Sequence, residues 1–463
     1  MLRIRILLCA MLACVGLGAA GDAEQALASH GQVTYFEAPQ GLLNPQTRPQ
    51  TITQLQALGV HALRVELYWR DVAPNAGGAV RPSFDGTNPA NYSWGQYDLV
   101  MAEAQRLHWP VLLTVTGPGP KWATASKKDF VTRPDPMQFE QFMTAVGRHF
   151  GSEVALYAIW NEPNHPDYLM PQFVHGVATS PRLYRALFQD GYAGLQAAGL
   201  AHPKVLMGET APTGTSHVVS PLAFLRGTLC LNAKYKKASS CGSLPAYGYG
   251  HHAYTTAGGP FYQPHSTQDV TIGALARLTH ALDLAAHAHA IKAHIGIYLT
   301  EFGIQSKPNP YVGVAPAVQA EWDAISERIA YNNPRVQSFS QYLLSDDPVG
   351  GSPGSPYIGF QTGLEYVSGK PKPLFAGWPL PLVVSKQGKA FSLWGLVRPA
   401  GSATSVTVLA QTAGSKSFRV LKTVHTDSRG YWALHSSTRA TSWRVRWTSP
   451  AGVKYQGPPI RAH

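Results

Sequence analysis

The sequence predicts a (β/α)8 barrel, the TIM-barrel class of α/β folds, followed by a small all-β sandwich domain. Over residues 30–380, short apolar β-branched runs alternate with stretches of helical periodicity, as in βα units around a parallel sheet. Near 377–381 the helical periodicity stops and short alternating runs begin. The 463 residues, 44% of them hydrophobic, are ample for a packed core and exceed one ordinary domain.

The first segment, residues 1–21, is expected to be a secretory signal peptide. Two arginines precede an apolar run from position 6 to 17, and small residues follow that run. A basic start, a short apolar stretch and a small-residue cleavage site are typical of a signal removed on export, and the run is too short to span a bilayer. We therefore expect a secreted, extracellular protein. Cys14 leaves a lipoprotein signal as the alternative.

The barrel is expected to use eight strands, of which the fourth and the seventh end in glutamate motifs. The motif Trp-Asn-Glu-Pro-Asn occupies 160–164, and Leu-Thr-Glu-Phe-Gly occupies 299–303. A helix over Pro136–Phe150 begins with a proline at its first position and places its apolar residues on one stripe, and 271–290 repeats this pattern. The predicted strands are 32–36, 62–67, 111–115, 155–160, 204–207, 248–252, 295–299 and 337–343.

The distance between the two motifs predicts enlarged loops. Glu162 and Glu301 are 139 positions apart, whereas three βα units of a barrel of ~250 residues need only about 95. The surplus indicates insertions at the carboxyl ends of the strands, with 213–245 as the main candidate and 117–135 and 348–356 as further long loops. Such loops usually shape a ligand cleft, although surface elaboration is the alternative for each.

The main insertion contains a cysteine pair. Two of the four cysteines lie in the expected signal, which leaves Cys230 and Cys241. In an oxidising compartment this pair is expected to form a disulfide. A metal site is the alternative, but no second cysteine pair would complete it, and His287 and His289 face different sides of a helix. We expect neither a metal site nor a cofactor.

Residues 381–463 are expected to form a small antiparallel β-sandwich. In its last predicted strand Trp443 and Trp447 share one face and Arg444 and Arg446 share the other, which is the pattern of a half-buried strand. Exposed aromatics on such a domain can bind sugars, but this alternation favours a core position for both tryptophans. The predicted strands are 405–410, 418–424, 431–434 and 442–447.

The net charge of +12 is concentrated in this sandwich. Twelve Lys and Arg and one acidic residue, Asp427, lie in 381–463, whereas the 26 basic and 25 acidic residues elsewhere nearly balance. An anionic surface such as cell-wall polymer or acidic polysaccharide is a candidate partner, and a merely soluble, charged exterior is the alternative. Nucleic acid is not an expected partner of an exported protein. We expect a monomer.

The two motif glutamates indicate the chemistry. The carboxyl ends of the strands carry the working residues of such a barrel, and Glu162 and Glu301 lie at two of these ends. Cleavage of a glycosidic bond needs two carboxyl groups: one protonates the leaving oxygen, and the other attacks the anomeric carbon or activates a water. The sequence therefore predicts a glycosidase that hydrolyses O-glycosyl bonds.

These residues resemble a known group. Asn161-Glu162-Pro163 on a fourth strand, with Glu301 on a seventh, is similar to the clan of retaining (β/α)8 glycoside hydrolases that includes family 5 cellulases and family 39 β-xylosidases. The resemblance covers about residues 30–380. It implies that Glu162 is the general acid/base and Glu301 the nucleophile, and that Asn161 binds the sugar 2-hydroxyl. The implied reaction is double displacement on β-linked oligo- or polysaccharides.

Two further segments extend the resemblance. The stretch 59–65 resembles the clan's second strand, whose arginine supports the nucleophile, so Arg64 would hold Glu301 ionised and oriented. His-His-Ala-Tyr at 251–254 resembles the sixth-strand His-x-Tyr, so His252 would line the sugar site and Tyr254 would hydrogen-bond the nucleophile. A surface ion pair is the alternative for Arg64, and a structural role is the alternative for the histidine pair.

The sequence determines less about the roles of the aromatic residues. Trp69 and Trp122 are candidate platforms for a sugar ring, with a place in the barrel core as the alternative. Many clan members end the eighth strand with a tryptophan, whereas this chain has a glutamine and a tyrosine at 341 and 342, which leaves the sugar open. The alternative function is a catalytically inactive carbohydrate-binding or cell-surface protein on the same fold.

Overall fold

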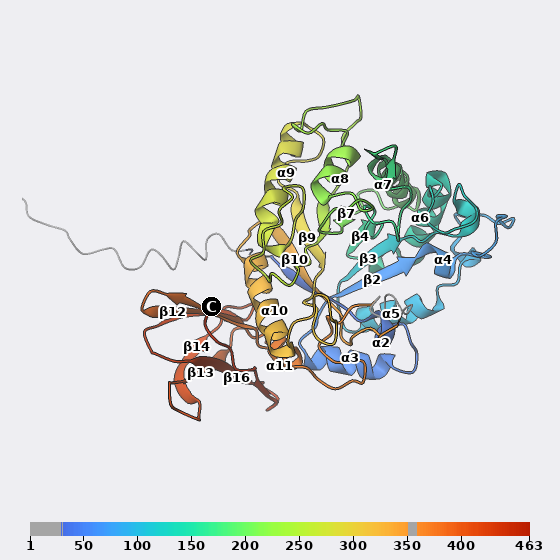
Figure 1. Cartoon of the computed structure of the whole chain (residues 1–463). Helices are drawn as coiled ribbons and strands as arrows, with labels where there is room; N and C mark the ends of the chain where they lie inside the picture. The colour runs from blue at the N-terminus through green and yellow to red at the C-terminus, as the bar shows by residue number, and fades with distance from the viewer. Residues whose placement is uncertain (1–28, 30, 351–358) are drawn as a thin grey trace, which may run out of the picture.

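The computed structural model describes residues 29, 31–350 and 359–463 (Figure 1). The expected signal peptide, residues 1–21, lies outside the described residues, as does most of the predicted loop 348–356. Within the described residues, no helix combines the length and the apolar character needed to span a membrane.

The fold class predicted from the sequence is confirmed. Parallel strands close a barrel in the order β1-β10-β9-β8-β7-β4-β3-β2, and each predicted barrel strand overlaps one of them. The strands are β1 (Val33–Glu37), β2 (Leu63–Tyr68), β3 (Val111–Thr116), β4 (Leu156–Ile159), β7 (Val205–Thr210), β8 (Gly248–His252), β9 (Gly296–Glu301) and β10 (Val336–Tyr342).

Helices surround the barrel (Figure 1). The α-helices are α2 (Pro39–Leu42), α3 (Arg48–Ala57), α4 (Trp69–Val72), α5 (Gly95–Arg106), α6 (Pro136–Phe150), α7 (Ser180–Ala197), α8 (Pro221–Thr228), α9 (Leu275–His287), α10 (Pro316–Tyr331) and α11 (Pro373–Gly377). Short 3-10 turns are η1 (Pro89–Asn91), η2 (Lys121–Ala123), η3 (Gly151–Glu153) and η4 (Ile272–Ala274). The predicted helix over 271–290 is thus η4 followed by α9.

Helix α6 shows how local sequence sets these boundaries. The Asp135 carboxylate accepts hydrogen bonds from the backbone N–H groups of Met137 and Gln138, which otherwise lack partners at a helix start. Pro136 occupies the first turn, where its missing N–H costs nothing. The apolar stripe of α6 is buried against the barrel, as the periodicity predicts.

The interior of the barrel changes from apolar to polar along the strands. The layer nearer the amino ends of the strands contains Ala62 and Leu112, in one buried cluster with residues from β1, β4 and β7. Two positions further along the same strands, the side chains on the same face are Arg64 and Thr114, and then Glu66. The apolar layer fills the barrel toward the amino ends of the strands, so the polar groups lie toward the carboxyl ends.

The main predicted insertion, residues 213–245, lies between β7 and β8, whereas a hairpin after β4 was not among the predicted loops. The segment between β7 and β8 contains α8 and a disulfide between Cys230 and Cys241. The connection after β4 carries a hairpin of β5 (Phe173–Val174) and β6 (Val177–Ala178). Both insertions follow the carboxyl ends of their strands.

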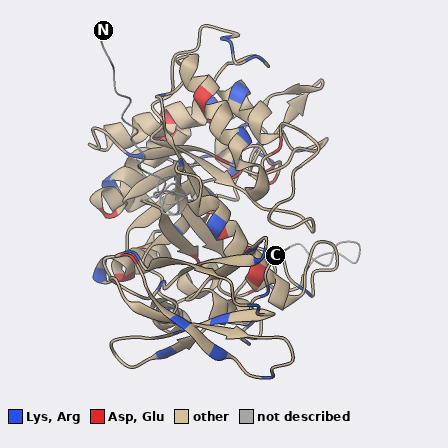
Figure 2. Ribbon diagram, turned by 90° about the vertical axis from the view of Figure 1, so that its left-hand side faces the viewer, with Lys and Arg blue, Asp and Glu red and all other residues tan. Residues whose placement is uncertain are grey.

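The C-terminal region forms two antiparallel sheets, ordered β11-β12-β15 and β14-β13-β16-β17. Trp443 and Trp447 are buried between them, so their predicted core position is confirmed. The strands β11, β12 and β17 were not predicted from the sequence. Lys and Arg are spread over the strands of this sandwich (Figure 2). The strands are β11 (Leu382–Gln387), β12 (Ala390–Leu396), β13 (Ser405–Gln411), β14 (Arg419–His425), β15 (Tyr431–Ser436), β16 (Ser442–Thr448) and β17 (Lys454–Gln456).

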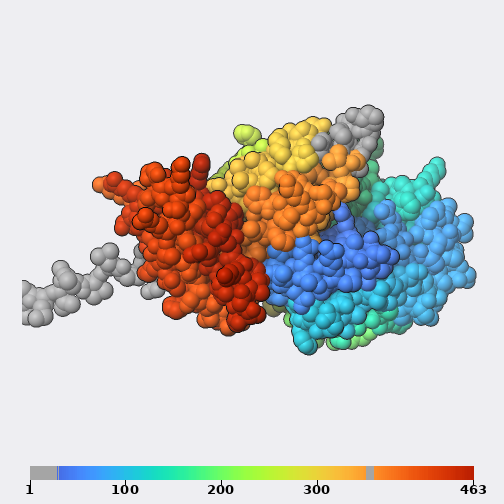
Figure 3. All heavy atoms as spheres, turned by 90° about the horizontal axis from the view of Figure 1, so that it is seen from below, coloured from blue at the N-terminus to red at the C-terminus, as the bar shows by residue number. Residues whose placement is uncertain are grey.

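The sandwich packs against the barrel (Figure 3). Its Arg398 forms a buried ion pair with Glu327 of α10, with nitrogen and oxygen 2.8 Å apart. The same guanidinium lies over the Trp378 ring, 3.9 Å from its centroid, and donates to Thr34 Oγ1 of β1. These contacts place the sandwich against α10 and the amino end of β1, whereas both motif glutamates lie at carboxyl ends.

A buried acid on α10, next to this interface, should make the free energy of unfolding depend on pH. Asp323 of α10 is buried beside Glu327, and burial, followed by the charge of Glu327, raises its pKa from 3.8 to about 8. The unfolded chain therefore releases this proton near pH 4 while the folded chain keeps it, so stability falls as the pH rises from about 4 to 8. Asp323→Asn cannot ionise. Its stability relative to wild type should rise by at least ~1 kcal/mol between pH 5 and pH 8, measured by denaturant unfolding. A difference that does not change with pH would contradict this expectation.

Candidate active site

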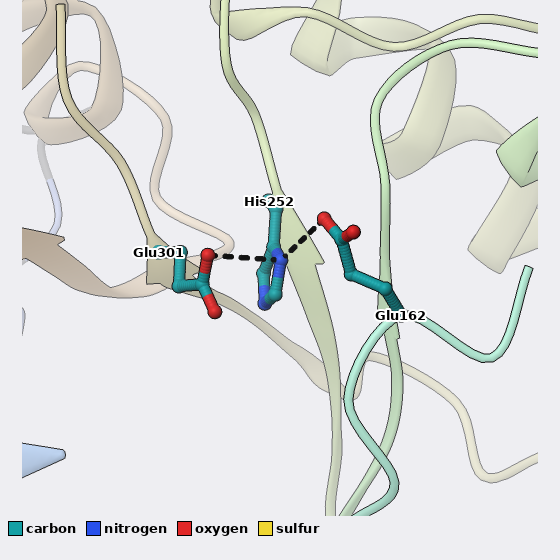
Figure 4. A group of neighbouring side chains, drawn as sticks. All are labelled: Glu162, His252 and Glu301. Atoms are coloured by element: carbon teal, nitrogen blue, oxygen red, sulfur yellow. Dashed lines mark hydrogen bonds and ion pairs between the residues drawn. The ribbon is translucent and has the colours of Figure 1, made fainter. Parts of the chain in front are cut away.

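Glu162 and Glu301 face each other across the carboxyl end of the barrel, with His252 between them (Figure 4). Glu162 follows β4, Glu301 ends β9 and His252 ends β8. His252 Nδ1 lies 2.9 Å from Glu162 Oε1 and 3.4 Å from Glu301 Oε2. One carboxylate oxygen of each glutamate and this nitrogen all lie within 4.8 Å of one another. The barrel thus brings together two carboxylates separated by 139 positions in the chain.

Glu162 is held by an unusual backbone. Trp160 and Glu162 adopt φ angles of 69° and 35°, a region that residues other than glycine rarely occupy. The Trp160 N–H donates to the Val115 carbonyl and the Glu162 N–H to the Glu209 carbonyl, while the Trp160 ring is fully buried. Neighbouring strands therefore enforce this conformation, and backbone outliers of this kind cluster at functional sites.

Both oxygens of Glu301 accept hydrogen bonds. Arg64 Nη1 donates to Oε1 at 2.7 Å, and the Tyr254 hydroxyl donates to Oε2 at 2.9 Å. The Glu301 side chain is 7% exposed. Two directed donors, one of them charged, hold this carboxylate in one orientation.

Arg64 is the central cation of the site. Its side chain is completely buried, and it forms ion pairs at 2.8 Å with Glu37 and at 2.9 Å with Glu209, besides Glu301. Arg64 Nη2 also donates to Asn161 Oδ1 at 2.9 Å. Burial acts to lower the pKa of Arg64, but the surrounding carboxylates outweigh burial and raise it. The guanidinium is a permanent positive charge beneath the two motif glutamates.

The two neighbouring histidines have different roles. Burial works against the charged form of His252, but Glu301 and Glu162 outweigh it and raise its pKa above the usual value. Burial lowers the pKa of His251 to about 4. His251 contacts the Val270 carbonyl and the Thr210 hydroxyl, at 2.8 and 3.0 Å. His252 therefore faces the carboxylates, while His251 is a structural residue.

Tyrosines surround the carboxylates. Tyr342 ends β10, and burial, followed by the charge of Glu301, raises its pKa well above the usual range. Gln341 instead donates to the Leu343 and Thr362 carbonyls. Of the two residues that the sequence left open at this strand end, the tyrosine lies near Glu301. Tyr168 is likewise close to the glutamates, whose charges add to burial in raising its pKa.

Trp69 and Trp122 are not brought to these carboxylates. Trp69 has no exposed surface, and its ring stacks on Phe142 of α6 with centroids 5.4 Å apart. Because side chains alternate along β2 and Glu66 faces inward, the position after Tyr68 points outward. Trp122 is 4% exposed and packs edge-on against Trp69. The expectation that Trp69 offers a face to a sugar is wrong, and Trp122 packs in the same outer layer.

Sequence reasoning missed the acidic residues around Arg64. Glu37 ends β1, Glu66 lies on β2 two positions after Arg64, and Glu209 lies in β7. Each lies in the carboxyl half of its barrel strand, as Glu301 does. Glu37, Glu66 and Glu301 each place an oxygen within 4.8 Å of the others. Such carboxylates are typical metal ligands, but here Arg64 contacts two of them within 2.8 Å and supplies the positive charge.

Comparison with known proteins bears on the fold. No family model matches the chain, and no curated protein matches it either. The chain is similar to the solved structure of a glucosidase from Croceicoccus marinus, with 9% sequence identity and a TM-score of 0.52, over 89% of this chain and 94% of that one. This similarity supports the same overall architecture and does not by itself assign an activity.

Two further solved structures are similar at lower scores. A monomeric β-xylosidase from Caulobacter crescentus CB15 is 14% identical, with a TM-score of 0.49, over 94% of this chain and 96% of that one. β-Glucuronidase 2 from Bacteroides uniformis is 10% identical, with a TM-score of 0.48, over 94% of this chain and 46% of that one. The chain therefore spans about half the length of the β-glucuronidase.

Proposed function

We propose that this protein is a retaining glycosidase that cleaves the O-glycosidic bonds of β-linked oligo- or polysaccharides. The observation that carries the proposal is the approach of one oxygen of Glu162 and one of Glu301 to within 4.8 Å. Carboxyl groups about 5–5.5 Å apart permit a covalent glycosyl-enzyme, whereas inverting enzymes leave about 6.5–9.5 Å for a water. The short separation supports double displacement.

The first step forms the glycosyl-enzyme. A Glu301 oxygen attacks the anomeric carbon while Glu162, as a carboxylic acid, gives its proton to the departing glycosidic oxygen. The bond from the anomeric carbon to that oxygen breaks, and the aglycone leaves as an alcohol. The Tyr254 hydroxyl and Arg64 orient the attacking carboxylate.

The second step reverses the roles. Glu162, now a carboxylate, takes a proton from a water whose oxygen attacks the anomeric carbon, and Glu301 leaves as a carboxylate. Because Arg64 donates to Asn161 Oδ1, the Asn161 side chain offers its amide N–H groups as donors, one toward the Tyr168 hydroxyl and the other for a sugar hydroxyl. Such a contact strengthens as positive charge develops on the sugar in the transition state.

The stereochemistry of the product tests this proposal. We expect wild-type protein to release the β-anomer first from a hydrolysed 4-nitrophenyl β-glycoside, as seen by proton NMR before mutarotation. First release of the α-anomer would contradict double displacement. If wild type and Glu301→Gln are equally inert on a wide panel of glycosides but both bind sugar, the protein is a non-catalytic carbohydrate-binding protein instead.

Secretion and the sandwich surface belong to the same proposal. We infer that residues 1–21 direct export and that the basic sandwich holds the barrel near anionic polymer. Arg446 and Lys454 lie exposed on adjacent strands of the four-stranded sheet, and exposed cations attract such polymers. Arg446→Glu with Lys454→Glu should release the protein from bacterial wall material in a pelleting assay at low salt. Unchanged retention would contradict the anchoring role, and export is tested by locating the protein in the culture medium.

A further inference from the structure

The site contains a carboxylate that the proposed mechanism does not use. Glu66 lies on β2, faces the barrel interior, and has a side chain that is 10% exposed. Its Oε2 accepts a hydrogen bond from the Tyr68 hydroxyl at 2.9 Å. Its Oε1 has no hydrogen-bond partner among the described residues. The nearest cation, Arg64 Nη2, lies 3.7 Å from Oε1, beyond hydrogen-bond distance.

Glu66 lies beside the proposed nucleophile. One oxygen each of Glu66, Glu37 and Glu301 all lie within 4.8 Å of one another. A sugar ring joined to Glu301 through its anomeric carbon extends over a comparable distance, so its ring substituents reach Glu66. A buried acceptor without a partner is costly unless a ligand supplies donors.

The charge around Glu66 restricts what that ligand is. Arg64 already contacts Glu37, Glu209 and Glu301 closely. Acidic groups therefore outnumber the guanidinium, even though burial raises the pKa of Glu37 well above its usual value. An ionised carboxylate only accepts hydrogen bonds, which suits sugar hydroxyl groups. A carboxylate on the sugar would meet like charge in a site shielded from water, where repulsion is strong.

We propose that Glu66 is a substrate-binding residue that makes this pocket select a neutral sugar, whose hydroxyl groups donate to Glu66, over a uronic acid. The inference rests on the proposed glycosidase function, because it assigns Glu66 to the sugar that reacts with Glu301. The inference thereby specifies that the sugar bound to Glu301 is a neutral one.

The selectivity should depend on pH. Burial raises the pKa of Glu66 to about 7; Arg64 opposes this shift and the charge of Glu301 adds to it. The groups that face Glu66 are Arg64, Glu301, Tyr68 and Glu209, together with Glu37, Tyr168 and Tyr342. Below about pH 7 the Glu66 carboxyl group becomes neutral, so repulsion of a uronate weakens. Discrimination against uronides should be larger at pH 8 than at pH 6.

The kinetic test compares wild type with Glu66→Gln. The substrates are 4-nitrophenyl β-glucoside, β-galactoside, β-xyloside and β-glucuronide, at pH 6 and pH 8. In Glu66→Gln we expect kcat/KM for the best neutral glycoside to fall about 10-fold, mainly through KM, as for loss of a charged hydrogen bond. The ratio of neutral to uronide kcat/KM should fall at least ~10-fold and lose its pH dependence. Glu103→Gln on the surface of α5 is the control and should match wild type.

A binding experiment separates this inference from the proposed function. The same glycosides are titrated into Glu162→Gln and into the double variant Glu162→Gln/Glu66→Gln, with ligand-observed NMR as readout and thermal melting as the folding check. One outcome is that wild type hydrolyses none of the glycosides while, in the double variant, neutral glycosides bind more weakly and the uronide binds more tightly. In that case only the proposed function fails. The inference is overturned if removing the Glu66 carboxylate changes the affinity for neutral glycosides and the preference over the uronide by less than twofold in both experiments. It is also overturned if no neutral glycoside binds.

Discussion

Glu301→Gln is expected to lower kcat on an activated aryl β-glycoside by about 10⁴-fold or more. The amide cannot form the glycosyl-enzyme, and removal of a nucleophile from a concerted catalytic set typically costs rates of this order. The fold should survive, because glutamine has the same shape and can still meet the Tyr254 hydroxyl. The measurement is steady-state kinetics, with a thermal melt to establish that the variant is folded.

Azide distinguishes the roles of the two glutamates. In Glu301→Ala, azide can occupy the space of the lost carboxylate and attack from the same side, so the expected product is the α-glycosyl azide. In Glu162→Ala, azide attacks the glycosyl-enzyme from the opposite side, and the β-glycosyl azide is expected. An exchange of these two products would show that the nucleophile and the acid/base have been assigned the wrong way round.

Arg64→Met is expected to destabilise the fold by about 3–5 kcal/mol. The guanidinium is fully buried and contacts Glu37, Glu209 and Glu301 within 2.9 Å. Removal of one partner from a buried ionic cluster leaves uncompensated charge, which costs far more than the loss of a surface pair. Denaturant unfolding at pH 7 measures the effect.

Two matched variants test the physical reason for this loss. Arg106→Met breaks an ion pair with Glu103 in which the arginine is 60% exposed, so it should cost less than ~1 kcal/mol. Adding Glu37→Gln to Arg64→Met should recover part of the lost stability, because it removes one unpaired carboxylate. Equal costs for Arg64→Met and Arg106→Met, or no recovery, would contradict the cluster explanation.

Much of the fold can be predicted from local patterns. Barrel strands are recognisable because a strand buried on both faces is a continuous apolar run, and α6 is recognisable because its cap, proline and apolar stripe agree. Trp443 and Trp447 were placed in the core because a half-buried strand alternates with period two. The strands β11, β12 and β17 were missed because their alternation is short or interrupted by turn residues.

The sequence alone determined which residues carry the proposed chemistry. Glu162 and Glu301 could be singled out because each lies in a short motif, at 160–164 or 299–303, that follows an apolar strand, and a parallel barrel brings its strand ends to one face. Only the tertiary structure decided the groups around them. Along β2, Arg64 and Glu66 share one face and Trp69 lies on the other, so the alternation already shows which residues belong together. Which of these two faces lines the barrel interior depends on how the barrel closes. The ion pairs of Arg64 with carboxylates from distant strands depend on the same closure.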